Sequence, residues 1–273
     1  MSQESLRGAV LGHPINHSLS PLLHKKAFNL LGINGEYSAI EVKSGELQEF
    51  IEKRGNDFDY FSLTMPLKEE ALDLNLNIEI DTLGKRIQSI NTLIRNGNAW
   101  SATSTDGSGF IKSLNNAGYS KFNKVLVLGA GGTARAVAGA LDDIATSVDV
   151  MRRSVRRSSA IAACFEKIEC NFLDWDDLVD LSGYDLVVNT TPSGAADLVA
   201  ENLPNQINGL LFDVLYKPWP TLLARRWGDA GGKTVSGLEL LLYQGIDQLK
   251  LVTNLDVNSI DKDLRLALSN ATI

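Results

Sequence analysis

The stretch Val125-Leu126-Val127-Leu128-Gly129-Ala130-Gly131-Gly132-Thr133-Ala134-Arg135-Ala136 decides how the second half of this 273-residue chain folds. Its four apolar residues predict a buried strand, and the Gly-x-Gly-x-x-Ala pattern predicts a tight turn into a helix. In such a turn Gly129 makes the bend, Gly131 lets a phosphate approach the backbone, and Ala134 lets the helix pack on the strand. Because a strand precedes the glycines and a helix follows, the pattern indicates a dinucleotide site rather than an ordinary turn of small residues.

More than a hundred residues precede this turn, so another folding unit comes first along the chain. A chain of this length has room for two domains of about 100–200 residues each. We therefore expect an α/β protein with an N-terminal α/β substrate-binding domain over residues 1–103. A Rossmann-type, doubly wound nucleotide-binding domain is expected over 104–236, and a C-terminal helical segment, 237–273, is expected to return to the first domain.

The composition excludes several classes of function. The formal net charge of −7 argues against nucleic acid as a partner. The sequence contains neither an apolar run of about 18 residues nor a charged-then-apolar start, so we expect no membrane partner and a cytoplasmic location. Cys164 and Cys170 lie outside any cluster of His or Cys, which predicts idle thiols and no metal site. The composition is compatible with a monomer or a homodimer.

The first strand is predicted over residues 7–12, and a loop rich in hydroxyl groups and ring nitrogens follows it. Ser20 before Pro21 predicts an N-cap and first helical position, and Gly32 predicts the end of that helix. Ser18 and Ser20 at a helix N-terminus suit a carboxylate or phosphate ligand. An equally good interpretation is that Ser20 only caps the helix and that Ser18 faces water.

Further along, alternating residues predict strands over 36–42 and 58–64 with a helix over 45–54 between them, which is typical of a parallel βαβ unit. Pro66 ends the second strand and begins a helical turn. Asn96-Gly97 predicts a hairpin between two more strands.

Lys68 and Asp106 each follow a predicted strand end, Asp106 at the start of the next helix. Charged residues after turns are usually solvated. Open α/β sheets nevertheless expose their sites at strand ends, which favours a functional role for both residues.

The predicted second strand of the nucleotide domain, 147–151, ends in Arg152-Arg153-Ser154. An NAD-specific site usually has an acidic residue there, and Asp149 lies too early in the strand to replace it. Guanidinium groups suit a 2′-phosphate, so the sequence favours NADP, although a solvated basic turn is the alternative. Later strands are predicted over 185–189 and 210–216, and a long helix begins near 236, with Gln244 facing either a pocket or water.

Several motifs, taken together and in order, resemble those of the shikimate dehydrogenase family over nearly the whole chain. They are Gly12-His13-Pro14-Ile15-Asn16-His17-Ser18-Leu19-Ser20-Pro21, Leu63-Thr64-Met65-Pro66-Leu67-Lys68, Ile90-Asn91-Thr92, Thr105-Asp106-Gly107, the glycine-rich turn, Asn189-Thr190-Thr191, Asp213-Val214-Leu215-Tyr216 and Gly237-Leu238 with Gln244. The serine-rich loop and the Pro-x-Lys segment are the specific parts of this resemblance.

The resemblance implies reversible, NADPH-dependent reduction of 3-dehydroshikimate to shikimate, a step of aromatic amino acid biosynthesis. It implies that Lys68 and Asp106 form the catalytic pair and that Ser18 and Ser20 bind the substrate carboxylate. The remaining substrate contacts implied are Thr64, Asn91, Tyr216 and Gln244, beside the catalytic pair. The cofactor contacts implied are Gly129, Ala130, Gly131, Gly132, Thr133, Ala134, Arg152, Arg153, Ser154, Asn189, Thr190, Thr191, Val214 and Gly237.

The chain departs from the family pattern at six positions, where the family usually has other residues: Ser104, Arg152, Ser154, Thr190, Pro192 and Val214. None of these departures falls on the proposed catalytic pair. The main alternative is a quinate/shikimate dehydrogenase that uses NAD or a broader range of substrates. A methylenetetrahydrofolate dehydrogenase and a binding protein without turnover are two further alternatives.

Overall fold

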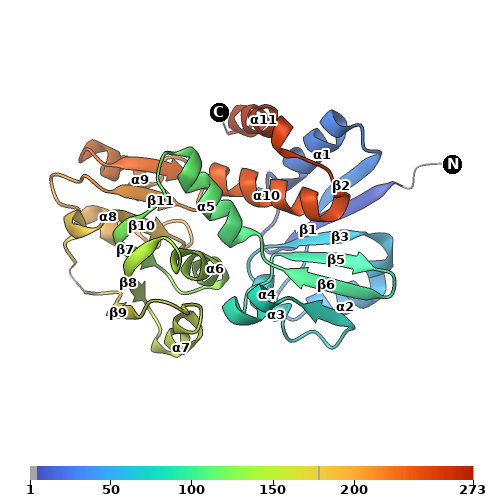
Figure 1. Cartoon of the computed structure of the whole chain (residues 1–273), viewed down its shortest axis with the longest axis horizontal. Coiled ribbons are helices and arrows are strands. Elements are labelled where there is room, and N and C mark those ends of the chain that lie inside the picture. Colours follow the sequence, from blue (N-terminus) through green and yellow to red (C-terminus); the bar gives the residue numbers. More distant parts are fainter. Residues whose placement is uncertain (1–4, 178, 273) are drawn as a thin grey trace. The chain divides into compact units, whose positions relative to one another are not determined.

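The structure is a computed structural model that describes residues 5–177 and 179–272. It is α/β and divides into two compact units, one formed by Met1–Gly109 with Leu241–Ala271 and the other by Phe110–Leu240. The chain passes between the units inside two helices, α5 (Asp106–Asn116) and α10 (Gly237–Thr253), as Figure 1 lets the reader trace. The boundaries expected from the sequence, 103/104 and 236/237, lie slightly earlier, at the starts of these helices.

The first unit is built on a six-stranded mixed sheet. The strands β2, β1 and β3 are parallel, β5 is antiparallel to both of its neighbours, and β4 is parallel to β6. This arrangement confirms the parallel unit and the hairpin, in which Gly97 has a φ of +63°. In spatial order the strands are β2 (Gly35–Glu41), β1 (Leu6–Gly12), β3 (Tyr60–Leu63), β5 (Thr92–Asn96), β6 (Ala99–Thr103) and β4 (Ile78–Ile80).

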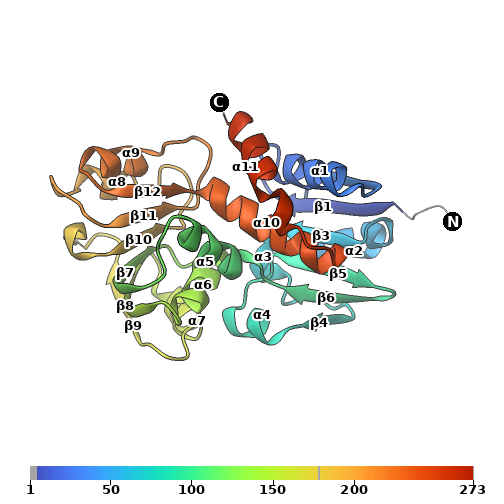
Figure 2. The same cartoon turned by 45° about the horizontal axis from the view of Figure 1, so that its top comes forward.

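Short helices complete this unit, and α1 and α11 lie side by side in it (Figure 2). The predicted N-cap of α1 is wrong: the helix begins one residue earlier, because the Leu19 carbonyl already accepts a hydrogen bond from Leu23 N. Gly32 ends the helix with a φ of +67°, as predicted. The helices are α1 (Ser20–Leu31), α2 (Leu47–Arg54), α3 (Leu67–Glu70), α4 (Thr82–Ile87) and α11 (Asp261–Asn270), with 3-10 turns at Gly55–Asp57 and Asn258–Ile260.

The second unit contains an all-parallel sheet of six strands. Counted along the chain from β7, the spatial order is 3-2-1-4-5-6, the doubly wound order of dinucleotide-binding folds, which confirms the predicted fold class. The order reverses between β7 and β10, where such sheets bind their ligands. From one edge to the other the strands are β9 (Cys170–Asp174), β8 (Ala145–Arg152), β7 (Phe122–Leu128), β10 (Leu186–Asn189), β11 (Leu210–Asp213) and β12 (Lys233–Ser236).

Helices cover both faces of this second sheet. On one face Leu126 and Leu211 pack in a core with Ala200 of α8 and Trp227 of α9. Phe212 points to the opposite face, where its ring meets Phe110 of α5 with centroids 4.9 Å apart. The helices that belong wholly to this unit are α6 (Gly132–Leu141), α7 (Ser158–Ala162), α8 (Asp197–Glu201) and α9 (Leu222–Asp229), with 3-10 turns at Val155–Arg157 and Leu181–Gly183.

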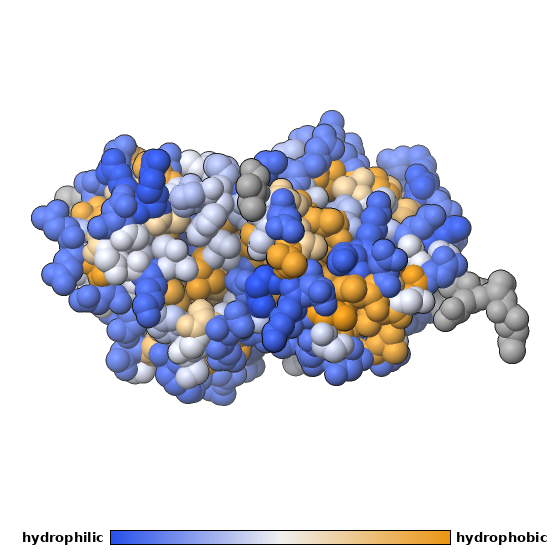
Figure 3. All heavy atoms as spheres, turned by 90° about the horizontal axis from the view of Figure 1, so that it is seen from above, coloured by the Kyte–Doolittle hydropathy of each residue, from blue (hydrophilic) through white to orange (hydrophobic). Residues whose placement is uncertain are grey.

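The surface mixes hydrophilic residues with scattered hydrophobic ones, as Figure 3 shows for one face. Among the described residues, no helix is both long and apolar enough to cross a bilayer. Cys164 is buried and Cys170 half-buried, and neither is part of a disulfide; the Cys164 thiol donates to the Ala160 carbonyl at 3.3 Å. Within the same described part of the chain, no three His, Cys, Asp or Glu side chains gather as metal ligands would.

Candidate active site

Three polar residues meet at one edge of the first sheet because of its topology. β3 and β6 point the same way, so the segments that follow them emerge at the same edge. Lys68 follows β3 on α3, and Asp106 follows β6 at the start of α5. β5 is antiparallel to both, so Asn91, which precedes β5, lies at that edge as well. The two predicted catalytic residues are therefore brought together with a predicted substrate contact.

Lys68 and Asp106 form an ion pair in which the lysine Nζ donates to Asp106 Oδ2. Their side chains are 14% and 5% exposed, so the pair is largely shielded from water. The second carboxylate oxygen, Oδ1, accepts a hydrogen bond from Asn91 Nδ2 at 2.8 Å. The Asp106 carboxylate is thus fixed at both oxygens, which holds the ammonium group in a defined position.

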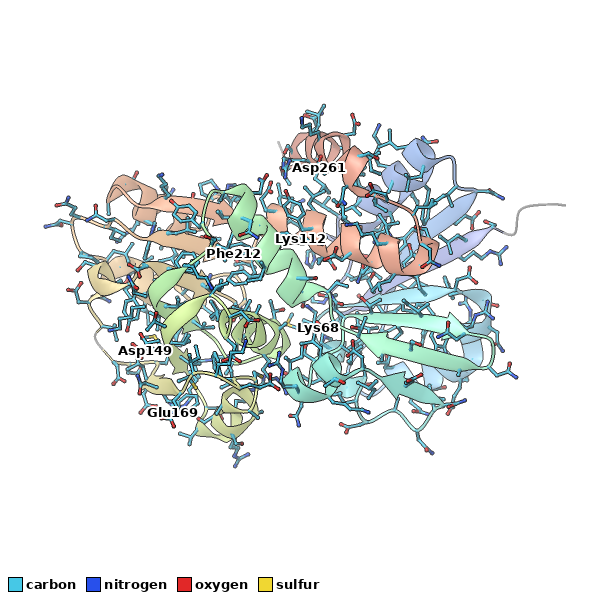
Figure 4. The ribbon with its side chains drawn as sticks, viewed as in Figure 1. Lys68, Lys112, Asp149, Glu169, Phe212 and Asp261 are labelled. Carbon is cyan, nitrogen blue, oxygen red and sulfur yellow. The ribbon has the colours of Figure 1, made fainter. Side chains whose placement is uncertain are left out.

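The backbone around Lys68, labelled in Figure 4, is also anchored. Leu67 is fully buried in the core of the first unit, and its N–H donates to the Thr64 carbonyl at 2.8 Å. The Lys68 carbonyl accepts a hydrogen bond from Ile90 N at 2.8 Å, next to Asn91. This backbone hydrogen bond ties Lys68 to the Ile90–Asn91 segment, which also holds its partner Asp106.

Gln244 on α10 is buried rather than facing water, at 9% exposed. Its Oε1 lies 3.4 Å from Asn91 Nδ2, and its Nε2 donates to the Leu241 carbonyl at 2.9 Å. The helices α5 and α10 approach closely here, since a Cβ atom at Gly109 would lie 2.7 Å from Gln244 N. The structure thus places Gln244 beside Asn91, as the predicted site requires.

Thr64 and the serine-rich loop start from the neighbouring strands β3 and β1. Thr64 N donates to the Leu11 carbonyl at 2.9 Å, and a Cβ atom at Gly12 would lie 2.4 Å from Thr64 Cγ2. Ser18 is half-buried and its Oγ accepts a hydrogen bond from Ser20 N at 3.3 Å, while Ser20 itself is buried. Hydroxyl groups, an amide, a carboxylate and an ammonium group therefore share one edge, a donor set that suits a small, hydroxylated acid.

In the second unit, the glycine-rich turn has the geometry that a pyrophosphate needs. Gly129 has a φ of +106°, which L side chains rarely adopt. Gly131 is the N-cap of α6 with an extended backbone, and as a glycine it has no side chain to cap the helix. A Cβ atom at Gly131 would come within 4 Å of one group, Arg157 Nη1 at 3.6 Å. The residues fit a phosphate at the helix N-terminus, with Ala130, Gly132, Thr133 and Ala134 in the same turn and first helical residues.

The arginines after β8 have different surroundings. Arg152 donates to Ser158 Oγ at 2.6 Å and to the Leu173 carbonyl at 3.2 Å, and it forms an ion pair with Asp174. Arg153 is exposed, and Ser154 beside it is half-buried. Arg157, a further arginine of the same basic segment that was not among the predicted cofactor contacts, donates to the Ala130 carbonyl at 3.2 Å. Arg157 therefore reaches the glycine-rich turn, whereas Arg152 is engaged by Asp174.

The last residues of β10 and β11 are joined by a hydrogen bond in which Asn189 Nδ2 donates to Asp213 Oδ1 at 3.1 Å. Burial raises the pKa of Asp213, while hydrogen bonds from Leu215 N, Thr221 Oγ1 and Asn189 oppose that shift. Asn189 Oδ1 in turn accepts hydrogen bonds from Thr191 N and Oγ1.

The loops after β10 and β11 also contact the ends of β7 and β12. Thr190 Oγ1 donates to the Leu128 carbonyl at 2.7 Å, next to Gly129. A Cβ atom at Gly237 would lie 2.0 Å from the Val214 carbonyl oxygen, so glycine is required at this position. Tyr216 follows β11 in this unit and is half-buried.

The comparison with known proteins agrees with this geometry. Residues 10–93 match the family model of the shikimate dehydrogenase substrate-binding domain, and residues 113–213 match that of shikimate/quinate 5-dehydrogenase. The chain belongs to the shikimate dehydrogenase family. It is 34% identical to the NADP⁺-dependent shikimate dehydrogenase of Thermus thermophilus, over 96% of this chain and 99% of that one. With the corresponding enzyme of Methanosarcina acetivorans it shares 36% identity over 90% and 92% of the two chains.

Solved structures of shikimate dehydrogenases have the same fold. The enzyme of Mycobacterium tuberculosis superimposes with a TM-score of 0.85 at 31% identity, covering 97% of this chain and 99% of that one. The Thermus thermophilus enzyme in complex with NADP(H) and shikimate superimposes with a TM-score of 0.82 at 34% identity, covering 96% and 99%.

Sequence reasoning on this shikimate dehydrogenase family member missed several residues that hold the site together. Thr105 N donates to Asn91 Oδ1 at 2.9 Å, and Glu70 accepts hydrogen bonds from Gly45 N and Leu47 N, which ties α3 to α2. Gln248, one helical turn after Gln244, donates to the Asn91 carbonyl at 3.2 Å. The spacing of four between these two glutamines was the available signal, because such residues share one helix face.

Proposed function

We propose that this chain catalyses the reversible, NADP-dependent reduction of 3-dehydroshikimate to shikimate, with Lys68 and Asp106 as the catalytic pair. The observation that supports this most directly is the shielded ion pair between these residues, fixed by Asn91 in a chain of the shikimate dehydrogenase family. The relatives named above are NADP⁺-dependent, which supports NADP over NAD.

When bound, NADPH supplies the hydride that reduces the ring carbonyl carbon. Negative charge then grows on the carbonyl oxygen, and the Lys68 ammonium stabilises it and donates a proton to it. Asp106 keeps the ammonium group oriented and balances its charge. In the direction of oxidation Lys68 accepts the hydroxyl proton, so it has to be neutral at that step, and the rate of oxidation is expected to rise with pH.

The polar groups at the same edge are proposed to select the substrate. Ser18 and Ser20 bind the substrate carboxylate, and Thr64, Asn91 and Gln244 bind ring hydroxyls. A site built to satisfy several hydroxyl groups rejects analogues that lack them, since its buried polar groups would be left without partners. Tyr216, from the loop after β11, is proposed as a further substrate contact.

The second unit is proposed to hold NADP through its glycine-rich turn, with the pyrophosphate at the N-terminus of α6. The 2′-phosphate is assigned to Arg153, Ser154 and Arg157, whereas Arg152 holds the end of β8 through Asp174. Val214 and Gly237, with the loop of Asn189, Thr190 and Thr191, are proposed to border the nicotinamide end.

An absorbance assay tests this proposal. Purified protein should oxidise NADPH in the presence of 3-dehydroshikimate, and it should reduce NADP⁺ with shikimate. Parallel reactions with NADH, and with quinate in place of shikimate, distinguish the proposal from a quinate/shikimate dehydrogenase of broader use. A protein that turns over neither substrate pair, or that prefers quinate and NAD⁺, would contradict it.

A further inference from the structure

A buried chain of hydrogen bonds leads from the far side of the first sheet to the catalytic carboxylate. Tyr37 of β2 donates to Ser62 Oγ at 2.5 Å, and Ser62 donates to Gln248 Oε1 at 2.8 Å. Gln248 Nε2 donates to Thr92 Oγ1 at 2.9 Å. Thr92 donates to Asn91 Oδ1 at 2.7 Å, and Asn91 Nδ2 reaches Asp106.

All donors in this chain point the same way, toward the Asp106 carboxylate. A hydrogen bond strengthens the next one when both are aligned in a low-dielectric interior, and the strongest acceptor here is the charged carboxylate at the end. The side chains of Ser62, Thr92 and Gln248 are at most 5% exposed, so water does not compete for these contacts. The direction of the chain therefore favours a fixed position of the Asp106 carboxylate.

The far end of the chain stays uncharged over the pH range of an enzyme assay. Burial raises the pKa of the Tyr37 hydroxyl and of the neighbouring Tyr60 hydroxyl. Burial lowers the pKa of His24, which stacks on Tyr37, to about 3. The charged groups bonded to the chain are thus Asp106 and, through it, Lys68.

Gln248 is the junction of this chain, and it is fully buried. Its oxygen accepts from Ser62, and its nitrogen donates both to Thr92 Oγ1 and to the Asn91 carbonyl at 3.2 Å. An apolar residue of the same length would leave the Asn91–Thr92 segment without its two contacts to α10. Buried polar groups that lose a partner shift or rearrange, because leaving them unsatisfied is costly.

We propose that Gln248 is a positioning residue for the reaction: it fixes the Asn91–Thr92 segment, and so keeps the Asn91 amide on Asp106 and the carboxylate aligned with Lys68. This inference rests on the proposed function, because it assigns Gln248 a part in the same site.

The test compares Gln248→Met, which removes the junction at nearly constant volume, with Ser62→Ala as the matched control. Ser62→Ala cuts the chain on the side away from Asn91 and leaves both Gln248 contacts to the Asn91–Thr92 segment. We expect Gln248→Met to lower kcat about tenfold, the effect of one lost aligned hydrogen bond, and Ser62→Ala to change it less than about threefold. The KM for shikimate should change less than kcat in Gln248→Met, because Gln248 contacts the Asn91–Thr92 segment and leaves the proposed carboxylate contacts at Ser18 and Ser20 untouched.

A double-mutant cycle with Asn91→Ala separates positioning from general destabilisation. If Gln248 acts through the Asn91 side chain, adding Gln248→Met to Asn91→Ala should change kcat little further. Full additivity, or a Gln248→Met enzyme with the kcat of the wild type, would overturn the inference. Should Gln248→Met fail to fold, Thr92→Val removes the next link of the same chain and must give the same kinetic pattern. If the wild type itself has no activity, the proposed function is refuted. If the wild type is active and Gln248→Met leaves its kcat unchanged, only the inference about Gln248 is refuted.

Discussion

His24 should make the stability of this protein fall steeply on mild acidification. The ring is fully buried, it stacks on Tyr37 with centroids 4.0 Å apart, and its Nδ1 lies 2.7 Å from the Tyr60 hydroxyl. Burial lowers its pKa from 6.5 to about 3, although the neighbouring Gln248 side chain opposes the shift. The folded protein thus keeps His24 neutral, whereas the unfolded chain protonates it readily.

The sign of the effect follows from the number of bound protons. Between pH 6.5 and about 3 the unfolded chain carries a proton on His24 that the folded protein does not, so the free energy of unfolding decreases as the pH falls through this window. Within this window each unit of pH lowers the free energy of unfolding by about 1.4 kcal/mol. Between pH 7 and pH 6 the loss is smaller, because half of that interval lies above the unfolded pKa. Going from pH 7 to pH 5 should therefore remove about 2 kcal/mol of stability through His24 alone.

Urea unfolding of the wild type and of His24→Gln, each at pH 7 and pH 5, measures this contribution. Glutamine keeps an acceptor for the Tyr60 hydroxyl but does not titrate, and the exposed His13 and His17 remain in both proteins. The loss of stability between the two pH values should be about 2 kcal/mol smaller in His24→Gln, at unchanged m-value. An equal loss in both proteins would refute the reasoning, since the titrating group would then lie elsewhere.

Three further results are expected. Lys68→Met should lower kcat by about 10²–10⁴-fold with an unchanged circular dichroism spectrum, because it removes a positioned acid–base group; near-normal turnover would contradict its role. Arg157→Ala should raise the KM for NADP⁺ more than the KM for NAD⁺ in steady-state assays; equal effects of this variant on both cofactors would exclude a 2′-phosphate contact by Arg157. Arg152→Ala, which removes the ion pair with Asp174, should mainly lower Tm. Gly237→Ala should destabilise the fold by about 1–3 kcal/mol in urea unfolding, since its Cβ would overlap the Val214 carbonyl; a neutral result would contradict the close contact.

The sequence predicts those parts of the fold that depend on local patterns. Some turns need a backbone conformation that few residue types adopt, so the residue type predicts the turn. This holds for the glycine-rich turn, the hairpin at Asn96-Gly97 and the helix end at Gly32. The strand β4 gave no signal, because it has three residues and is only half-buried. The strand β9 is similar, since its residues are exposed or half-buried and show no clean alternation.

Tertiary partners are harder to predict, and Arg152 is the clearest example. Its position after a strand predicts a phosphate contact, which stays a prediction, but the sequence does not reveal that the register of β8 and β9 also pairs Arg152 with Asp174. Nothing in the local sequence of either strand specifies that register. The role of Gln248 is hard to predict for a related reason. The residue pattern of a helix shows which positions are polar, but it does not show which polar side chains bond to a buried group on another element.

The arrangement of the candidate active site follows from one antiparallel strand in an otherwise mostly parallel sheet. A parallel strand would begin at the edge opposite to the ends of β3 and β6, which would place the residue preceding it far from Lys68 and Asp106. Because β5 runs the other way, Asn91 lies at the start of its strand and still reaches the carboxylate. The same reversal places the Asn91–Thr92 segment within reach of Gln244 and Gln248 of α10. The hairpin turn at Asn96-Gly97, which lies away from the candidate site, is thus a condition for the hydrogen bonds that hold the proposed catalytic pair.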